Sequence, residues 1–180
     1  LNNDVKFGSD FLGLLISNIL KRNLEVNVPK IFFESPLGRI WYGGKGGFSS
    51  KWTSFYAYGH PKGRDSIDIG QYDKDSIVRY APTCAMLLKA EIFKRIGLMD
   101  EFYFCYFDDT DFVYRLIKNK ITIGYTAETS LIHKVGGSSG GFMSNFIAKY
   151  YGRNRTYFYV KHFGIFYGLL WLPIYTFYYI

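Results

Sequence analysis

Apolar positions near the start of the chain follow first a helical and then a strand-like pattern. The helical spacing is seen at Phe11, Leu14, Leu15, Ile19 and Leu20. This spacing predicts a helix, with Ser9 or Asp10 as its N-cap. A short strand is predicted over 24–33, where Pro29 should lie at a sheet edge or at a bulge. With a strand end at residues 1–5, these pieces predict a strand–helix–strand unit of a parallel sheet.

Short apolar runs continue this alternation along the chain. Apolar runs occupy 40–42 and 83–88, strands are expected over 77–80, 121–125 and 131–133, and helices are expected over 90–96 and 112–120. The glycine run 43–47 lacks the spacing of a phosphate-binding P-loop and predicts a flexible loop. Residues 48–76 show no helical period, which predicts a long loop of the kind that often carries function. The pattern as a whole predicts an α/β fold.

Composition limits the class of protein. A chain of 180 residues with 48% hydrophobic and 21% charged residues suits one globular domain with a sizeable core. The net charge is +7, but the basic residues form no long block, so a nucleic-acid groove is not favoured. Cys84 and Cys105 form no C-x-x-C pair, which argues against a thiolate zinc site. The sequence opens on Leu1 without a signal-peptide pattern, and we expect that an N-terminal part is missing.

The composition changes near Phe142. Aromatic and basic residues alternate over 142–162, which predicts a basic amphipathic helix. Residues 163–180 carry no charge, a length that suits a membrane span. Their Tyr and Trp side chains and Pro173 suit the membrane interface equally well. We expect this segment to be membrane-associated, spanning or lying on the surface, or else to be a hydrophobic helix docked on protein. The basic residues upstream place the chain at the cytoplasmic face of the cell membrane.

Three carboxylates stand among five aromatic residues over 103–112. Burial of ionised carboxylates is costly unless they pair, bind a cation or take up a proton. Asp108 and Asp109 precede the apolar pattern of the helix predicted from residue 112. One interpretation is that they cap that helix, and the other is that they belong to a catalytic or binding site. Asp111 is expected to cap the helix or to pair with Arg115, four residues along on the same face.

Several separated pieces of the sequence match one protein family in order and spacing over residues 1–155. They are Leu1-Asn2-Asn3-Asp4, Ile40-Trp41-Tyr42-Gly43-Gly44, Gly70-Gln71-Tyr72-Asp73, Ala85-Met86-Leu87, Glu91-Ile92-Phe93, Ile96-Gly97-Leu98-Met99-Asp100-Glu101-Phe102-Tyr103-Phe104, Asp108-Asp109-Thr110-Asp111-Phe112, Arg115-Leu116, His133-Lys134-Val135-Gly136 and Ser138-Ser139-Gly140-Gly141. With these pieces the chain resembles the C-terminal portion of the catalytic domain of family-2 glycosyltransferases, in the rhamnosyltransferase-like branch. The resemblance implies an α/β, Rossmann-like GT-A fold that is incomplete at its N-terminus and is followed by a C-terminal hydrophobic helix. Residues 1–141 would be its metal- and acceptor-binding part.

The resemblance also implies roles for individual residues. Asp4 would hold a divalent cation, Mg²⁺ or Mn²⁺, as the charged member of the family's D-x-D-type motif. His133 would lie near the metal and the diphosphate, since imidazole is a reasonable Mn²⁺ ligand. Asp109 would be the catalytic base and Asp108 the first member of the acidic pair, where the family usually has Glu.

The substrate side is implied in less detail. Trp41 would belong to an acceptor platform or, equally, to the ordinary aromatic core. Asp111 and Arg115, which lie in the same matching stretch as the base, would contribute to substrate binding. The loop of Ser138 and Ser139 would lie over phosphates through its backbone N–H groups or would be merely flexible.

The function implied is inverting transfer of a sugar from a nucleotide-diphosphate sugar to a glycan or lipid-linked acceptor, as in polysaccharide biosynthesis. The family's N-terminal strand–helix–strand units, which hold the nucleotide, are absent from these 180 residues. Activity would therefore need the missing segment or a partner chain. One alternative is a non-catalytic, membrane-attached remnant that serves as a glycan-binding or interaction module. Another is a metal-dependent phosphodiesterase that uses Asp4, Asp108, Asp109 and His133.

Overall fold

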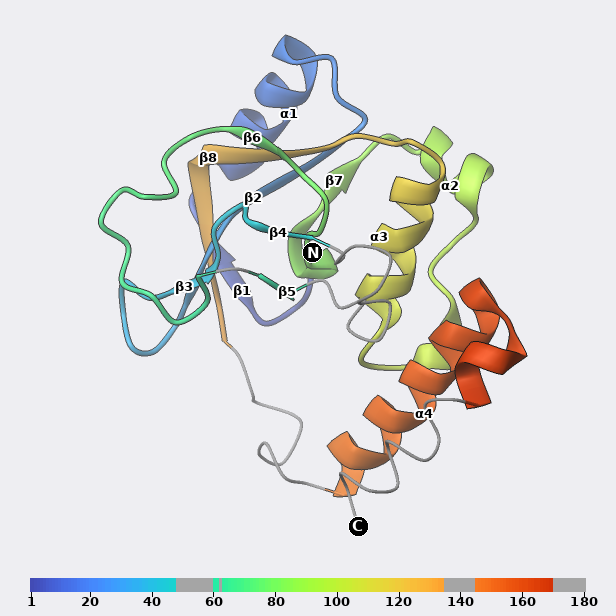
Figure 1. Cartoon of the computed structure of the whole chain (residues 1–180). Coiled ribbons are helices and arrows are strands. Elements are labelled where there is room, and N and C mark those ends of the chain that lie inside the picture. Colours follow the sequence, from blue (N-terminus) through green and yellow to red (C-terminus); the bar gives the residue numbers. More distant parts are fainter. Residues whose placement is uncertain (48–59, 62, 135–144, 170–180) are drawn as a thin grey trace. The chain divides into compact units, whose positions relative to one another are not determined.

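The computed structural model describes residues 1–47, 60–61, 63–134 and 145–169. The chain forms two compact units, drawn together in Figure 1. The first unit comprises Leu1–Leu98 and Phe112–Val135, and the second comprises Met99–Asp111 and Gly136–Ile180. The division falls inside helix α3 (Asp108–Lys118), between Asp111 and Phe112.

A mixed six-stranded sheet forms the centre of the first unit. Its strands are β1 (Val5–Phe7), β2 (Val26–Phe33), β3 (Ile40–Tyr42), β6 (Ser76–Val78), β7 (Leu87–Leu88) and β8 (Ile123–His133). The two long strands, β2 and β8, pair in parallel. Short antiparallel strands flank them, with β1 and β6 on β8, and β3 and β7 on β2. A separate two-stranded sheet joins β4 (Gly46–Gly47) to β5 (His60–Pro61). The sequence-based prediction of an α/β fold is confirmed at this level.

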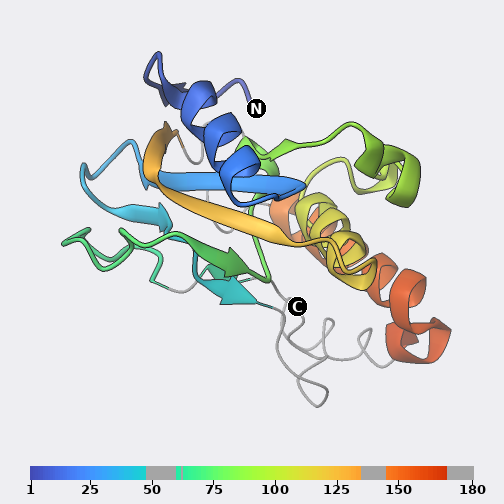
Figure 2. The same cartoon turned by 90° about the horizontal axis from the view of Figure 1, so that it is seen from above.

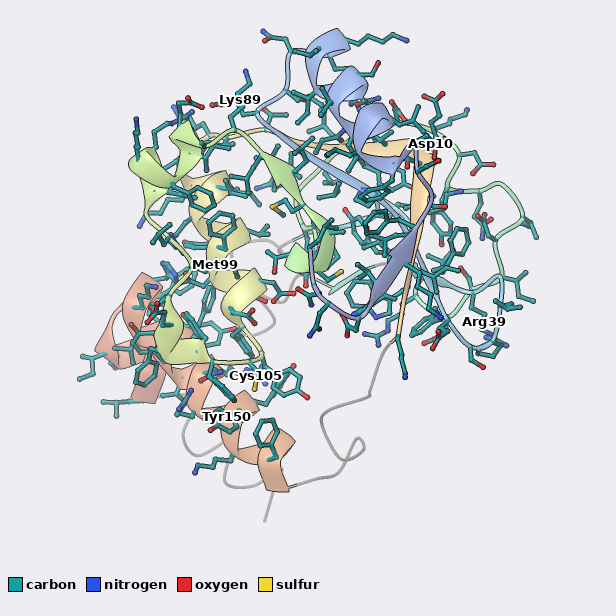
Figure 3. The ribbon with its side chains drawn as sticks, turned by 180° about the vertical axis from the view of Figure 1, so that it is seen from behind. Asp10, Arg39, Lys89, Met99, Cys105 and Tyr150 are labelled. Carbon is teal, nitrogen blue, oxygen red and sulfur yellow. The ribbon has the colours of Figure 1, made fainter. Side chains whose placement is uncertain are left out.

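Helix α1 (Phe11–Lys21) covers one face of the sheet, over β2 and β8 (Figure 2). It buries Phe11, Leu15 and Ile19, the positions whose spacing predicts the helix. Asp10 lies at its start (Figure 3), although the Asp10 side chain makes no capping hydrogen bond. The predicted helix is therefore confirmed. Asp10 occupies the N-cap position, but its side chain does not cap the helix.

Pro29 pairs with Thr126 of β8 on one side and, among the described strands, lies on its other side between the pairings of β2 with β7 and with β3. Strand β2 has neighbours on both sides, and its register with β8 shifts between Pro29 and Lys30. Because proline has no N–H to give to the ladder, an irregularity is expected there. In β8 the shift covers residues 127–129, and the N–H of Ala127 donates to Asp75 Oδ1 at 2.9 Å. The prediction of an edge or a bulge at Pro29 is confirmed by the bulge.

The predicted strand–helix–strand unit of a parallel sheet is wrong. Strand β1 runs antiparallel to β8, whereas β2 runs parallel to it. The chain turns at Asn3 and Asp4 and enters β1 in the direction opposite to β2. A three-residue strand at the end of a turn pairs with the nearest open edge, and here that edge is the C-terminal end of β8. Apolar patterning alone does not reveal strand direction.

The structure also sets the boundaries of three other elements that the apolar patterns indicate. The strands expected over 121–125 and 131–133 are one strand, β8. The apolar run over 83–88 forms a 3₁₀ turn, η2 (Thr83–Ala85), followed by β7. The helix expected over 90–96 is α2 (Glu91–Ile96), which ends at Gly97 with φ of +79°, as the glycine predicts.

Buried polar groups attach the loop before β6 to the sheet. Lys30 on β2 is almost wholly buried and forms ion pairs with Asp68, at 2.9 Å, and with Asp73. Burial lowers the pKa of Lys30, but the hydrogen bonds to Asp73 and Asp68 outweigh it and leave the pKa above its usual value. This part of the loop predicted over 48–76 is therefore anchored, while residues 48–59 and 62 lie outside the described residues.

The second unit contains the 3₁₀ turn η3 (Glu101–Tyr103), the first residues of α3, and helix α4 (Asn145–Phe163). A helix is thus observed where one was predicted over 142–162. Buried Phe158 and Tyr159 on α4 belong to an aromatic core in which the rings of Phe107 and Phe158 lie 5.9 Å apart. We refer to residues 102–107 as the aromatic loop.

Among the described residues, no helix combines the length and the apolar character needed to cross a membrane. Of the hydrophobic segment predicted over 163–180, residues 170–180 lie outside the described part.

Candidate functional site

Asp4 and His133 lie side by side in the first unit, although 129 positions separate them in the sequence. The pairing of β1 with β8 sets Val5 opposite His133, and the Lys134 N–H donates to the Asp4 carbonyl at 3.0 Å. As a result, His133 Nε2 lies 3.2 Å from Asp4 Oδ2. The two residues predicted as metal ligands are therefore brought together by the sheet.

The same two residues each carry a buried polar atom that has no hydrogen-bond partner in the described part of the chain, Asp4 Oδ1 and His133 Nδ1. A buried polar atom left unpaired is costly, so its retention calls for an explanation such as a bound ion or water. Carboxylate oxygen and imidazole nitrogen are both ligand atoms for divalent transition metals. Within the described ranges, no group of three or more His, Cys, Asp or Glu is arranged to hold a metal ion.

Trp41 and Arg64 complete this group in the first unit. The Trp41 ring meets His133 edge-on, with ring centroids 5.0 Å apart, and Trp41 Nε1 is a further buried atom without a partner among the described residues. The Arg64 guanidinium lies 5.5 Å from the centroid of the Trp41 ring. Arg64 thus brings a cation to the neighbourhood of His133. Sequence reasoning missed it, because the segment around Arg64 has no pattern that sets one basic residue apart.

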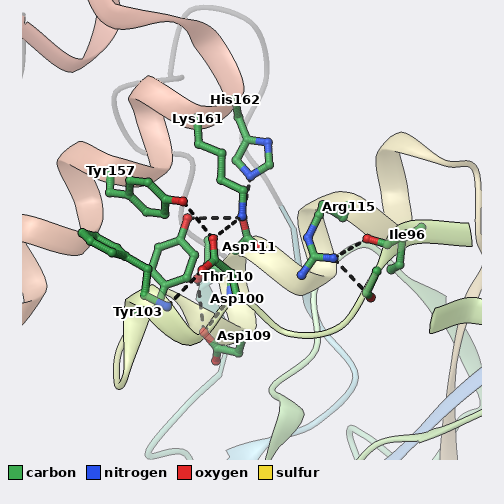
Figure 4. A network of polar contacts seen from close by, with 12 residues as sticks. Ile96, Asp100, Tyr103, Asp109, Thr110, Asp111, Arg115, Tyr157, Lys161 and His162 are labelled. Atoms are coloured by element: carbon green, nitrogen blue, oxygen red, sulfur yellow. Dashed lines mark hydrogen bonds and ion pairs between the residues drawn. The ribbon is translucent and has the colours of Figure 1, made fainter. Parts of the chain in front are cut away.

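In the second unit, the acidic cluster forms the first turn of α3. Asp108, Asp109 and Asp111 all belong to the helix, which begins four residues earlier than the apolar pattern predicts. Carboxylates in the first turn offset the positive end of the helix dipole, and this explains the early start. Asp109 Oδ1 accepts hydrogen bonds from the Thr110 N–H at 2.6 Å and from Thr110 Oγ1 at 3.3 Å (Figure 4).

Asp108 differs from Asp109 in its electrostatic environment. Burial raises the pKa of Asp108, backbone N–H groups of Asp108 and Asp109 partly oppose this, and the negative charge of Asp111 adds to the rise. The net direction is upward, so the fold favours the neutral form of Asp108 more than water does.

Asp111 is fully buried, and its polar partners in the second unit include Tyr103, Lys161 and His162 (Figure 4). Its Oδ1 lies 2.8 Å from Lys161 Nζ and 2.7 Å from His162 Nε2, and it accepts from the Tyr103 hydroxyl at 3.2 Å. Burial, together with the nearby Asp111 charge, raises the pKa of Tyr103 far above its usual value. Asp111 therefore holds α4 to the start of α3.

Asp100 uses the same lysine. Lys161 Nζ lies 2.7 Å from Asp100 Oδ2, which also accepts from the Tyr157 hydroxyl at 2.9 Å. Burial raises the pKa of Asp100, but the hydrogen bonds from Lys161, the Phe102 N–H and Tyr157 outweigh it and leave the pKa below its usual value.

Arg115, expected to pair with Asp111, anchors backbone in the first unit. Its guanidinium donates to the carbonyls of Ile96, at 2.5 Å, and Leu98, at 2.9 Å. These carbonyls lie at the C-terminal end of α2, where a cation is also favoured by the helix dipole. Partners other than those expected thus engage both Asp111 and Arg115, and their role in substrate binding stays a prediction.

The aromatic loop that leads into Asp108 has an unusual backbone. Phe104, Tyr106 and Phe107 all have positive φ, between +60° and +66°. Side chains other than glycine adopt this region at a cost of roughly 1 kcal/mol or more each, so the loop must be held by its surroundings.

Asn154 on α4 helps to hold the aromatic loop in this conformation. This fully buried amide donates from Nδ2 to the carbonyls of Tyr103, Cys105 and Tyr106, at 2.6–2.8 Å. Its Oδ1 accepts from Arg153 Nε at 2.8 Å, which fixes the orientation of the amide. Asn154 is therefore the residue that ties α4 to the loop preceding the acidic cluster.

Sequence reasoning missed Asn154, Lys161 and His162. Asn154, Phe158 and His162 recur every four residues along α4 and mark its buried side. A polar residue repeated on an otherwise aromatic helix face was the signal that could have found them. Ser138 and Ser139, predicted to lie over phosphates, are outside the described residues.

No protein-family model matches this sequence, and no curated protein matches it.

Proposed function

We propose that this chain is the metal- and acceptor-binding portion of a GT-A glycosyltransferase. The reaction is the inverting transfer of a sugar from a nucleotide-diphosphate sugar to a glycan or lipid-linked acceptor. The observation that supports this most is the pairing of Asp4 with His133, because the resemblance implies metal and diphosphate roles for these two residues. The parallel pairing of β2 with β8 is compatible with a Rossmann-like sheet.

The two residues fit a divalent cation chemically. Asp4 supplies a carboxylate and His133 an imidazole, and each has a buried atom without a partner among the described residues. A site with so few protein ligands suits a metal that takes its other ligands from water and phosphate oxygens. A cation bound there would neutralise negative charge on the diphosphate leaving group. Of the two ions expected, Mn²⁺ accepts imidazole more readily than Mg²⁺ does.

Asp109 is the base in this proposal. Its carboxylate takes the proton from the acceptor hydroxyl while the hydroxyl oxygen bonds to the anomeric carbon and the bond from that carbon to the diphosphate breaks. Attack opposite the leaving group inverts the anomeric centre. Burial raises the pKa of Asp108, so the two adjacent carboxylates need not ionise together, as is common for paired catalytic acids.

The test of this function is sugar-dependent release of nucleoside diphosphate. The protein, expressed from its complete reading frame, is incubated with Mn²⁺, a panel of nucleotide sugars and a lipid-linked glycan extract. We expect Asp109→Asn to lower turnover by about 10²-fold or more, the usual contribution of a general base. Glu101→Gln, which neutralises an exposed carboxylate next to the aromatic loop, should keep turnover near that of the unchanged protein.

Three outcomes would contradict the proposal. Turnover retained by Asp109→Asn removes the base assignment, and hydrolysis of the donor by water alone favours a phosphodiesterase instead. Failure of every donor to turn over in the presence of acceptor favours a non-catalytic glycan-binding module.

A further inference from the structure

The exposed side of α4 is unusual for a helix of a globular protein. Its exposed residues Phe146, Lys149, Arg153 and Val160 recur at spacings of three, four and seven, so they lie along one face. The opposite, buried face carries polar Asn154 and His162. The outward face thus combines apolar Phe146 and Val160 with basic Lys149 and Arg153, whereas the buried side also carries the aromatic core residue Phe158.

The apolar surface continues beyond α4. Gly164, with φ of +96°, ends the helix, and a further helical turn follows over 165–169. There Ile165 and Phe166 are each 70% exposed, and Leu169 is more than half exposed. Neighbouring exposed apolar side chains of this size commonly mark an interaction site.

Charge indicates the kind of partner. Residues 136–180 contain no Asp or Glu, while Lys149, Arg153, Arg155 and Lys161 are all basic. Lys161 is already paired with Asp100 and Asp111, so Lys149 and Arg153 are the exposed cations that this face offers to a partner. A partner that covers it should therefore carry negative charge.

Cations and rings alternate on this surface. The Arg153 guanidinium lies 4.8 Å from the ring centroid of Phe102 and 4.7 Å from that of Tyr150, and Lys149 also lies over the Tyr150 ring. Long basic side chains that lie along apolar surface, with their charges at its margin, suit the boundary between lipid headgroups and acyl chains. Nucleic acid would use the charges but leave aliphatic Val160, Ile165 and Leu169 without apolar partners.

We propose that the outward face of α4 and residues 165–169 together form a docking surface for a membrane that contains anionic lipid. The helix lies along the headgroup region, where Ile165, Phe166 and Leu169 are buried among acyl chains and Lys149 and Arg153 meet lipid phosphates. This surface does not depend on the proposed sugar transfer, since docking needs neither donor nor acceptor.

The experiment is co-sedimentation of the protein with vesicles of phosphatidylcholine alone or with added phosphatidylglycerol. We expect binding to the anionic vesicles that weakens as salt is added, because the electrostatic part of the attraction is screened. A variant with Ile165→Ser and Phe166→Ser should bind at least about tenfold more weakly, since two large apolar side chains no longer enter the bilayer.

The matched control changes two exposed apolar residues of the first unit, Leu12→Ser and Ile16→Ser, which are 52% and 43% exposed. This variant should bind as the unchanged protein does. The inference is overturned if the two double variants bind equally, if phosphatidylglycerol makes no difference, or if a single-stranded oligonucleotide binds while the vesicles do not. None of these outcomes touches the assignment of Asp109, which the turnover measurement tests separately.

Discussion

At the scale of single residues, the molecule places its carboxylates in contrasting surroundings. Asp4 lies beside His133 with one oxygen that lacks a partner among the described residues, Asp111 is buried among Tyr103, Lys161 and His162, and Asp108 is half-buried near another negative charge. The first arrangement suits a cation, the second stabilises a helix contact, and the third destabilises the ionised form. Similar residues in one sequence thus serve different physical purposes.

Asp108→Asn should raise stability at neutral pH. Because the folded-state pKa of Asp108 is above its unfolded value, the charged form costs free energy in the folded protein at pH values above that raised pKa. Asparagine removes this cost. The gain should shrink as the pH falls through the raised pKa toward the ordinary value of about 3.9. Urea unfolding at neutral and acidic pH measures it.

Asp100→Asn is the control, because it should change the free energy of unfolding in the opposite direction. The pKa of Asp100 is lowered in the fold, so its charge contributes stability that is present above the ordinary value and is lost as the pH falls through the lowered one. Asp100→Asn should therefore destabilise at neutral pH. Equal effects of the two substitutions on the free energy of unfolding would contradict the electrostatic account.

At the scale of elements, α4 holds the aromatic loop in a backbone conformation that the loop would not adopt alone. Three positive φ values within residues 104–107 cost free energy, and the Asn154 amide offsets that cost by donating to three carbonyls of the loop. The start of α3, and with it Asp108 and Asp109, follows directly from this loop. Helix α4 is thus part of what positions the acidic cluster.

Asn154→Ala should destabilise the second unit by about 1–3 kcal/mol, the cost of leaving buried carbonyls without donors. Asn154→Asp should cost more, because a carboxylate would face those carbonyls. Urea unfolding followed by near-ultraviolet circular dichroism, which reports on the buried tyrosines, measures this loss. The control is Asn119→Ala, which removes one exposed hydrogen bond to the Arg115 carbonyl and should cost less than about 1 kcal/mol. If Asn154→Ala lowered the free energy of unfolding no more than Asn119→Ala does, the Asn154 amide would not be what holds the aromatic loop.

At the scale of the whole molecule, the sequence predicts elements better than it predicts their partners. The period of α1, the glycine after α2 and the irregularity at Pro29 follow from local physics and are found in the structure. The direction of β1 and the continuity of β8 depend on pairing between distant residues, which no local pattern encodes.

In the candidate site, too, local sequence predicts individual residues better than it predicts their distant partners. Asp4 and His133 were identified from a resemblance, and only the β1–β8 register places them 3.2 Å apart. Asn154 and Lys161 escaped notice because their partners are backbone carbonyls and carboxylates some fifty positions away. A buried polar residue in a helix is apparent from sequence only when its burial is known.

The central claim is that Asp4 and His133 bind a divalent cation, and paramagnetic broadening by Mn²⁺ tests it most directly. Histidine ring protons are observed by NMR while Mn²⁺ is added, with His162, the partner of Asp111, as the internal reference. We predict that His133 signals broaden at lower Mn²⁺ concentrations than His162 signals do, and that Asp4→Asn raises the concentration required by about tenfold or more. If His133 and His162 broaden together, or if Asp4→Asn changes nothing, the claim is contradicted.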